Sequence, residues 1–226
     1  MAGTFPGFGA KTLPFFKALG FHQSKAWFDA NRGLYETDVL APMTALIDDL
    51  TAAFARKKIP LRGDGKRSIF RIHRDVRFAK DKSPYKTHAG AVMTRTGAKN
   101  DPGLLYIHID PTGCFVAAGF HIPDAPQLLR LRKAMAADPK AFASMTAALG
   151  KGKLTLGTES QMSRVPRGFE GLKGGPLDGA VRLKSFIVEE PLTAKAIASP
   201  DLTKAIADFA ARALPLLRYG WAALDR

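Results

Sequence analysis

The stretch "LLYIHIDPTGCFVAAGFHI", Leu104 to Ile122, has the pattern of two β-strands joined by a tight turn. In its first half, polar and apolar residues alternate, which sends them to opposite faces of a strand. The Pro-Thr-Gly sequence at 111–113 is a hairpin signal. Strands with so short a connection run in opposite directions, so this stretch predicts an antiparallel sheet.

Further strands are predicted on both sides of this hairpin. Their period-two segments are "SIFRIHR" from Ser68, "THAGAVMTR" from Thr87 and "VRLKSFIVEEP" from Val181. Thr12 and Ser24 are suited to cap helices, and Pro42 is expected to kink or restart the second of them. Ser199 followed by Pro200 predicts the start of a final amphipathic helix.

These signals give one order of elements along the chain. It is helical from 12 to 58, sheet-rich from 66 to 123 and helical from 125 to 149, with a strand and a final helix from 180 to 217. No internal repeat or long linker interrupts it. The sequence predicts a single α+β domain over residues 1–226, with a mostly antiparallel sheet packed by N-terminal and C-terminal amphipathic helices.

The composition of the chain limits the classes of protein to which it can belong. The chain has 226 residues, of which 46% are apolar, enough for one large core or at most two small ones. Cys114 is the single cysteine, so no intrachain disulfide is expected. The N-terminus lacks the pattern of a signal peptide, and no apolar run approaches the ~20 residues that span a bilayer. We expect a cytoplasmic protein with no membrane contact.

Positive charge is concentrated in one fifth of the chain. The net charge is +14, and residues 56–99 hold 14 basic against three acidic residues, a surplus of 11. Within them, "RIHRDVRFAKDKSPYK", Arg71 to Lys86, adds aromatic rings to the charge; we call it the basic block. Such a local surplus attracts anions, although a solvated, solubilising face is the simpler interpretation.

The basic block supplies the candidate anion ligands. Arginine forks suit planar, two-point recognition of phosphate or carboxylate, and lysines add point charges. Two aspartates are expected to orient these cations; internal ion pairs that pin the loop to the core are the alternative. Phe78 is expected to anchor in the core. The predicted ligands are Arg71, Arg74, Arg77, Lys82, Tyr85 and Lys86, with Asp75 and Asp81 as orienting residues.

Histidines suggest a second feature. Strand alternation places Tyr106, His108 and Asp110 on one face. If the strands pair in the right register, His73, His108, Asp110 and His121 would line one polar pocket together with Arg71. That pocket would bind an anion, carry out acid–base chemistry or hold a metal; surface or hydrogen-bonded histidines without a role are the alternative. No ligand pair at short spacing supports a metal, and we expect neither a metal nor another cofactor.

The basic block also resembles the R-x-x-R-D-x-R-F-x-x-D-K-x-P-Y-K hallmark of an uncharacterised domain family found in bacteria and fungi. The opening "FFKALGFHQSKAWFDANRGLYETDVLAPM" and the segments "GCFVAAGFHIP" and "VPRGFEG" are similar to other parts of that family. The resemblance covers nearly the whole chain. It implies a single α+β domain and no particular activity.

Three functions fit these observations. The first is binding of a phosphate-bearing or polycarboxylate small molecule, with any reaction on it left open. The second is non-specific nucleic-acid binding, for which charge and aromatic rings are the usual footprint but no known binding motif is present. The third is a structural or interaction module with no specific ligand.

Overall fold

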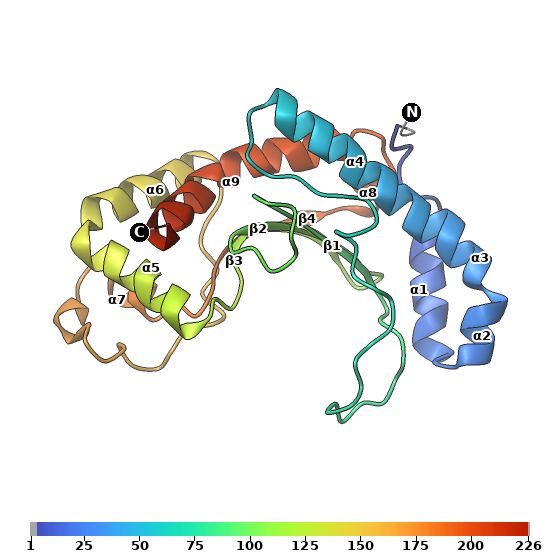
Figure 1. Cartoon of the computed structure of the whole chain (residues 1–226), viewed down its shortest axis with the longest axis horizontal. Coiled ribbons are helices and arrows are strands. Elements are labelled where there is room, and N and C mark those ends of the chain that lie inside the picture. Colours follow the sequence, from blue (N-terminus) through green and yellow to red (C-terminus); the bar gives the residue numbers. More distant parts are fainter. Residues whose placement is uncertain (1–3, 226) are drawn as a thin grey trace. The chain divides into compact units, whose positions relative to one another are not determined.

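Helices form both ends of the chain and one sheet lies between them, in a computed structural model that describes residues 4–225 (Figure 1). The sheet has four strands in the order β1-β2-β3-β4 and is antiparallel, so the predicted α+β class is confirmed. The described elements are α1 (Thr12–Phe21), α2 (Lys25–Ala30), α3 (Arg32–Tyr35), η1 (Glu36–Leu40), α4 (Ala41–Arg56), β1 (Ala89–Thr94), β2 (Leu104–Ile109), β3 (Cys114–Phe120), α5 (Ala125–Ala137), α6 (Pro139–Lys151), η2 (Glu170–Leu172), α7 (Asp178–Val181), β4 (Phe186–Leu192), α8 (Ala194–Ile197) and α9 (Leu202–Leu224).

Two compact units share these elements. Unit 1 comprises the chain up to Lys99 together with Tyr106–Val116 and Pro191–Asp208. Unit 2 comprises Asn100–Leu105, Ala117–Glu190 and the chain from Phe209 onward. Strands β2, β3 and β4 and helix α9 therefore contribute residues to both units.

The core of unit 1 forms where α4 meets β1. All six residues of β1 are buried, and α4 buries an apolar stripe of residues at helical spacing. Gly63 lies between the two elements, because a Cβ on it would come within 2.9 Å of the Ile47 side chain and 3.2 Å of the Met93 side chain.

The helix before α4 shows how a proline is accommodated. Pro42 lies in the first turn of α4 and follows the π-helical turn η1, close to the predicted restart. Proline has no N–H, so it cannot bond to the carbonyl of Asp38 four residues earlier. The buried Thr12 hydroxyl donates to that carbonyl oxygen at 2.6 Å instead. The prediction that Thr12 caps α1 is wrong, since Lys11 occupies that position, whereas Ser24 caps α2 as predicted.

The segment predicted as a strand from Ser68 to Arg74 pairs with two different partners. Ile69 bridges to Ala91 in β1, but His73 bridges to Tyr85. Because the segment leaves β1 before its end, it never becomes a regular strand, and this prediction is wrong. Residues 71–86 instead form two arms that run away from β1 to a tip (Figure 1).

Unit 2 packs its helices around the end of β3. The Phe120 ring fills the space beside Gly220 of α9, where a Cβ would lie 2.1 Å from the ring. Trp221 donates its indole N–H to the carbonyl of Pro102 at 2.9 Å. Buried Arg132 of α5 donates to the carbonyls of Val181 and Leu183, which ties the segment before β4 to α5.

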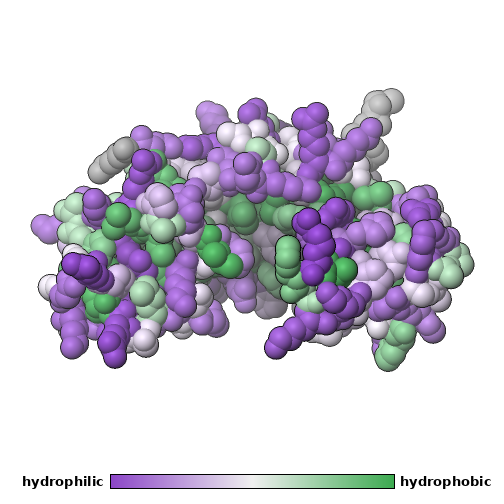
Figure 2. Space-filling model, turned by 60° about the horizontal axis from the view of Figure 1, so that its bottom comes forward, coloured by the Kyte–Doolittle hydropathy of each residue, from purple (hydrophilic) through white to green (hydrophobic). Residues whose placement is uncertain are grey.

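The surface is largely polar. Hydrophilic side chains cover most of the face drawn in Figure 2, with hydrophobic patches between them. Between residues 4 and 225, no helix combines the length and the apolar character that crossing a bilayer requires.

Candidate functional site: a cationic pocket beside a histidine cluster

A pocket of about 530 Å³ opens in unit 1 at the base of the two arms. Four of its eight lining residues are cations and none is acidic. We call it the cationic pocket; it is lined by Tyr35, Leu40, Lys66, Ile69, Phe70, Arg71, Lys86 and Lys99. Residues that are far apart in the sequence meet here because β1 brings the segment after it back beside Ile69.

Two lysines of the cationic pocket lie over one aromatic ring. The Lys86 and Lys99 ammonium groups lie 5.3 and 4.8 Å from the centre of the Phe70 ring. Lys99 also donates to the carbonyl oxygen of Ile69 at 2.6 Å. Phe70 is therefore half-buried under two cations rather than part of the core, which is a cation–π arrangement.

The charges in this pocket repel one another. Partial burial lowers the pKa of Lys86, and the neighbouring Arg71 and Lys99 lower it further. Partial burial also lowers the pKa of Lys99. Within residues 4–225, no ion pair involves Lys66, Arg71 or Lys86. The pocket thus carries positive charge without a matching carboxylate.

Other predicted anion ligands form contacts outside the cationic pocket. Arg74 pairs with Asp81, which also accepts hydrogen bonds from Ser83. Arg77 binds both oxygens of Asp75, at 3.0 and 2.7 Å, and this hydrogen bonding lowers the pKa of the Asp75 carboxyl. Both aspartates thus contact an arginine, as their predicted orienting role requires. Lys82 donates to the carbonyl of Val76 at 3.0 Å.

The aromatic residues of the basic block lie in opposite environments. Tyr85 is 4% exposed; it stacks on Phe28 at 4.6 Å, and its N–H donates to the side-chain oxygen of Gln23. Phe78 is 95% exposed at the tip, so the prediction that it anchors in the core is wrong. The arms carry the tip away from the apolar residues that would cover this ring, and the Arg77 guanidinium lies 5.8 Å from its centre.

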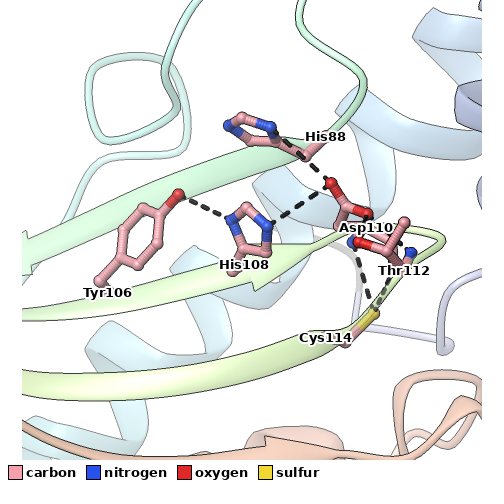
Figure 3. Close-up of polar contacts among 6 residues, drawn as sticks. All are labelled: His88, Tyr106, His108, Asp110, Thr112 and Cys114. Atoms are coloured by element: carbon pink, nitrogen blue, oxygen red, sulfur yellow. Dashed lines mark hydrogen bonds and ion pairs between the residues drawn. The ribbon is translucent and has the colours of Figure 1, made fainter. Parts of the chain in front are cut away.

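A second cluster lies on β2 and the start of β1 (Figure 3). The hydroxyl of Tyr106 is hydrogen-bonded to Nδ1 of His108 at 2.9 Å. Asp110 places Oδ2 3.7 Å from Nε2 of His108 and 3.9 Å from Nδ1 of His88. We call His88, His108 and Asp110 the histidine cluster.

Burial governs the ionisation of both imidazoles. It lowers the pKa of His88, and the neighbouring His108 lowers it further. It also lowers the pKa of His108, with the Asp110 carboxylate acting against the shift. Burial therefore favours the neutral form of both rings, in which one nitrogen carries a lone pair.

Aromatic rings connect the two features. The centres of the Phe70 and Tyr106 rings are 6.3 Å apart. The Tyr106 side chain lies against Gly90 of β1, where a Cβ would come within 2.7 Å of the Tyr106 hydroxyl oxygen. Phe70 therefore contacts cations on one side and Tyr106 on the other, and Tyr106 leads to His108.

The predicted pocket of histidines forms only in part. The face shared by Tyr106, His108 and Asp110 is present as alternation predicts. His73 instead packs its ring against Tyr85 and Phe28, because its segment has left β1 by that point. His121 follows the end of β3, is exposed and belongs to unit 2.

A comparison with protein-family models found one match, described as "Conserved hypothetical protein (DUF2461)", over residues 11–219. The chain belongs to the DUF2461 family. Neither the curated proteins nor the solved structures contain a match to the chain. Membership of DUF2461 agrees with the resemblance drawn from the basic block, and it assigns no activity, so the chemistry is argued from the site.

Three residues of this DUF2461 chain were missed as site residues. Lys66 and Lys99 were counted in the charged segment but lie outside the basic block, and only the fold shows that they join Arg71 and Lys86. His88 was recognised as a histidine in a predicted strand. Pairing of β1 with β2, which that prediction left open, brings it beside Asp110.

Proposed function

We propose that this protein binds a compact phosphate-bearing or polycarboxylate small molecule in the cationic pocket, in the cytoplasm. We also infer that the basic block is the hallmark of its family in bacteria and fungi. One observation carries the functional proposal: Lys66, Arg71, Lys86 and Lys99 converge on one pocket that no carboxylate lines.

Electrostatics explains why this arrangement favours an anion. Four cations held together repel one another, and an anion among them turns that repulsion into attraction. The guanidinium of Arg71 offers a planar fork for two oxygens, and lysines add charge around it. Partial burial lowers the pKa of Lys86, and the charges of Arg71 and Lys99 lower it further, an effect that a bound anion would oppose.

Replacing Lys86 by glutamine tests the proposal. We expect orthophosphate, citrate or ATP to raise the melting temperature of the wild-type protein; at 100 times Kd, a bound ligand adds about 2.7 kcal/mol to the free energy of unfolding. Lys86→Gln should lose most of this stabilisation. Lys80→Gln, which removes the same charge at an exposed position of the basic block, should keep it.

Two outcomes would contradict the proposal. If both variants lose stabilisation equally, the anions respond to overall charge and not to the pocket. If none of the three anions stabilises the wild-type protein at low ionic strength, the proposal fails.

A second candidate is non-specific nucleic-acid binding at the tip of the arms. The exposed ring of Phe78, next to Arg77, supports it, because stacking on an exposed ring is how such proteins hold bases. Asp75 and Asp81 act against it, since they neutralise Arg77 and Arg74 at the same tip.

A further inference from the structure

The histidine cluster brings two imidazole nitrogens and one carboxylate oxygen together from two neighbouring strands. These three atoms lie within 4.8 Å of one another. The contacts of Asp110 Oδ2, at 3.7 and 3.9 Å, are too long for hydrogen bonds. Within residues 4–225, no hydrogen bond reaches that oxygen. Two imidazole nitrogens and a carboxylate oxygen therefore face a common point.

The β2–β3 turn fixes the direction of the carboxylate. Oδ1 of Asp110 accepts hydrogen bonds from the backbone N–H and the hydroxyl of Thr112, at 2.7 and 2.6 Å. Both bonds come from the turn side, so Oδ2 is left toward His88 and His108 (Figure 3). The side chain is only 13% exposed, so solvent competes little for this oxygen.

The imidazole of His108 is held in a similar way. Tyr106 occupies its Nδ1, which leaves Nε2 toward Asp110. Its ring stacks on Phe115 at 4.6 Å and lies 4.5 Å from the ring of His88. A polar partner on the other ring nitrogen is the usual support of a metal-bound histidine.

The spacing suits one small ion. Zinc binds nitrogen and oxygen ligands at ~2.0–2.2 Å, so neighbouring ligand atoms around it lie roughly 3–3.5 Å apart. The observed contacts of 3.7 and 3.9 Å are longer than this, and all three atoms lie within 4.8 Å of one another, so the three side chains would move inward on binding an ion.

We propose that His88, His108 and Asp110 form a mononuclear site for a divalent transition-metal ion such as Zn²⁺ or Fe²⁺. Two imidazoles with one carboxylate favour these ions over Mg²⁺, which prefers oxygen ligands. Three protein ligands leave at least one coordination position for water or a substrate atom. This site goes beyond anion binding and does not depend on the cationic pocket. It replaces the expectation, drawn from sequence spacing, that no metal binds.

Titration of Zn²⁺ into tag-free, EDTA-treated protein at pH 7.5, followed by calorimetry, tests the site. We expect one equivalent to bind with micromolar or lower Kd. Asp110→Asn should weaken binding by more than the ~10–100-fold typical of outer partners, because it removes a direct ligand. Its amide oxygen can still accept from Thr112, so the turn is kept. His88→Gln should have the same effect.

A matched control separates binding at the histidine cluster from binding at an exposed histidine. His121→Gln, at an exposed histidine outside the cluster, should bind Zn²⁺ as the wild type does. The proposal is overturned if the wild type binds no equivalent of Zn²⁺, or if His121→Gln weakens binding as much as His88→Gln.

Absorption spectroscopy of the wild-type protein tests the site even if the variants fail to fold. One equivalent of Co²⁺ added to the wild-type protein should produce a visible d–d absorption band, and Zn²⁺ should abolish it. If Co²⁺ gives no band beyond that of the aqueous ion, the site does not exist.

Discussion

Gly119 in β3 has a φ of +139°, and a Cβ on it would lie 1.9 Å from the carbonyl oxygen of Phe186 in β4. The close approach and the backbone angle both require glycine. Because the opposing atom belongs to the backbone of a paired strand, it cannot rotate away as a flexible side chain would.

Gly119→Ala is therefore expected to destabilise the protein by at least about 2 kcal/mol, since strain and a backbone clash add together. Gly113→Ala, in the β2–β3 turn, should change stability by less than about 0.5 kcal/mol, because a Cβ there meets nothing within 4 Å. Urea unfolding of both variants measures the difference. Equal effects would contradict this prediction, because they would show that the protein has room for a Cβ at Gly119 despite the 1.9 Å approach to the Phe186 carbonyl oxygen.

The two arms of the basic block are joined by few backbone hydrogen bonds. Arg74 N–H donates to Pro84 and Lys86 N–H donates to Ile72, both at 2.8 Å. Stacking of Tyr85 on Phe28 fixes the base of the arms. The exposed ion pairs of the tip add little, because such pairs contribute about 0–1 kcal/mol.

Limited proteolysis with trypsin tests how well the tip is protected. We expect the first cuts after Arg77, Lys80 or Lys82, because the backbone there lacks ladder hydrogen bonds and is exposed. Mass spectrometry of early time points locates the cuts. A first cut in α4 or α9, which also carry arginines or lysines, would show that the tip is better protected than its hydrogen bonding indicates.

At the scale of the whole molecule, the surplus of positive charge is unevenly distributed. The net charge of +14 comes mostly from residues 56–99. The fold divides those cations among the cationic pocket, the neutralised tip and the open surface. Cations that converge on a pocket favour binding of a compact anion, whereas cations spread along a surface favour binding of a polyanion such as a nucleic acid.

Salt dependence distinguishes these two uses. A nucleic acid held by ~5 phosphate contacts loses affinity with a log–log slope near −0.9 per contact, roughly 10²–10³-fold between 50 and 200 mM salt. We expect no micromolar binding to random single- or double-stranded oligonucleotides at about 150 mM salt, measured by fluorescence anisotropy. Micromolar binding there, reduced by alanine at Lys80, Lys82 and Lys86, would favour the nucleic-acid function instead.

Much of the local structure could be predicted from the sequence alone. Alternation identified β2 and β3 and the shared face of Tyr106, His108 and Asp110. The Ser199-Pro200 signal identified the final amphipathic helix, α9, and side-chain chemistry identified the cap at Ser24. These features depend on backbone geometry that repeats every two or 3.6 residues, so neighbours in the sequence carry the signal.

Only the tertiary structure decided which distant residues meet. Because the chain after Ile69 leaves β1, His73 lies away from the predicted pocket, and Phe78 is exposed to solvent. Pairing of β1 with β2 brought His88 to Asp110, and return of the chain after β1 brought Lys99 to Phe70. Long-range encounters of this kind depend on strand pairing and loop closure, which no local periodicity records.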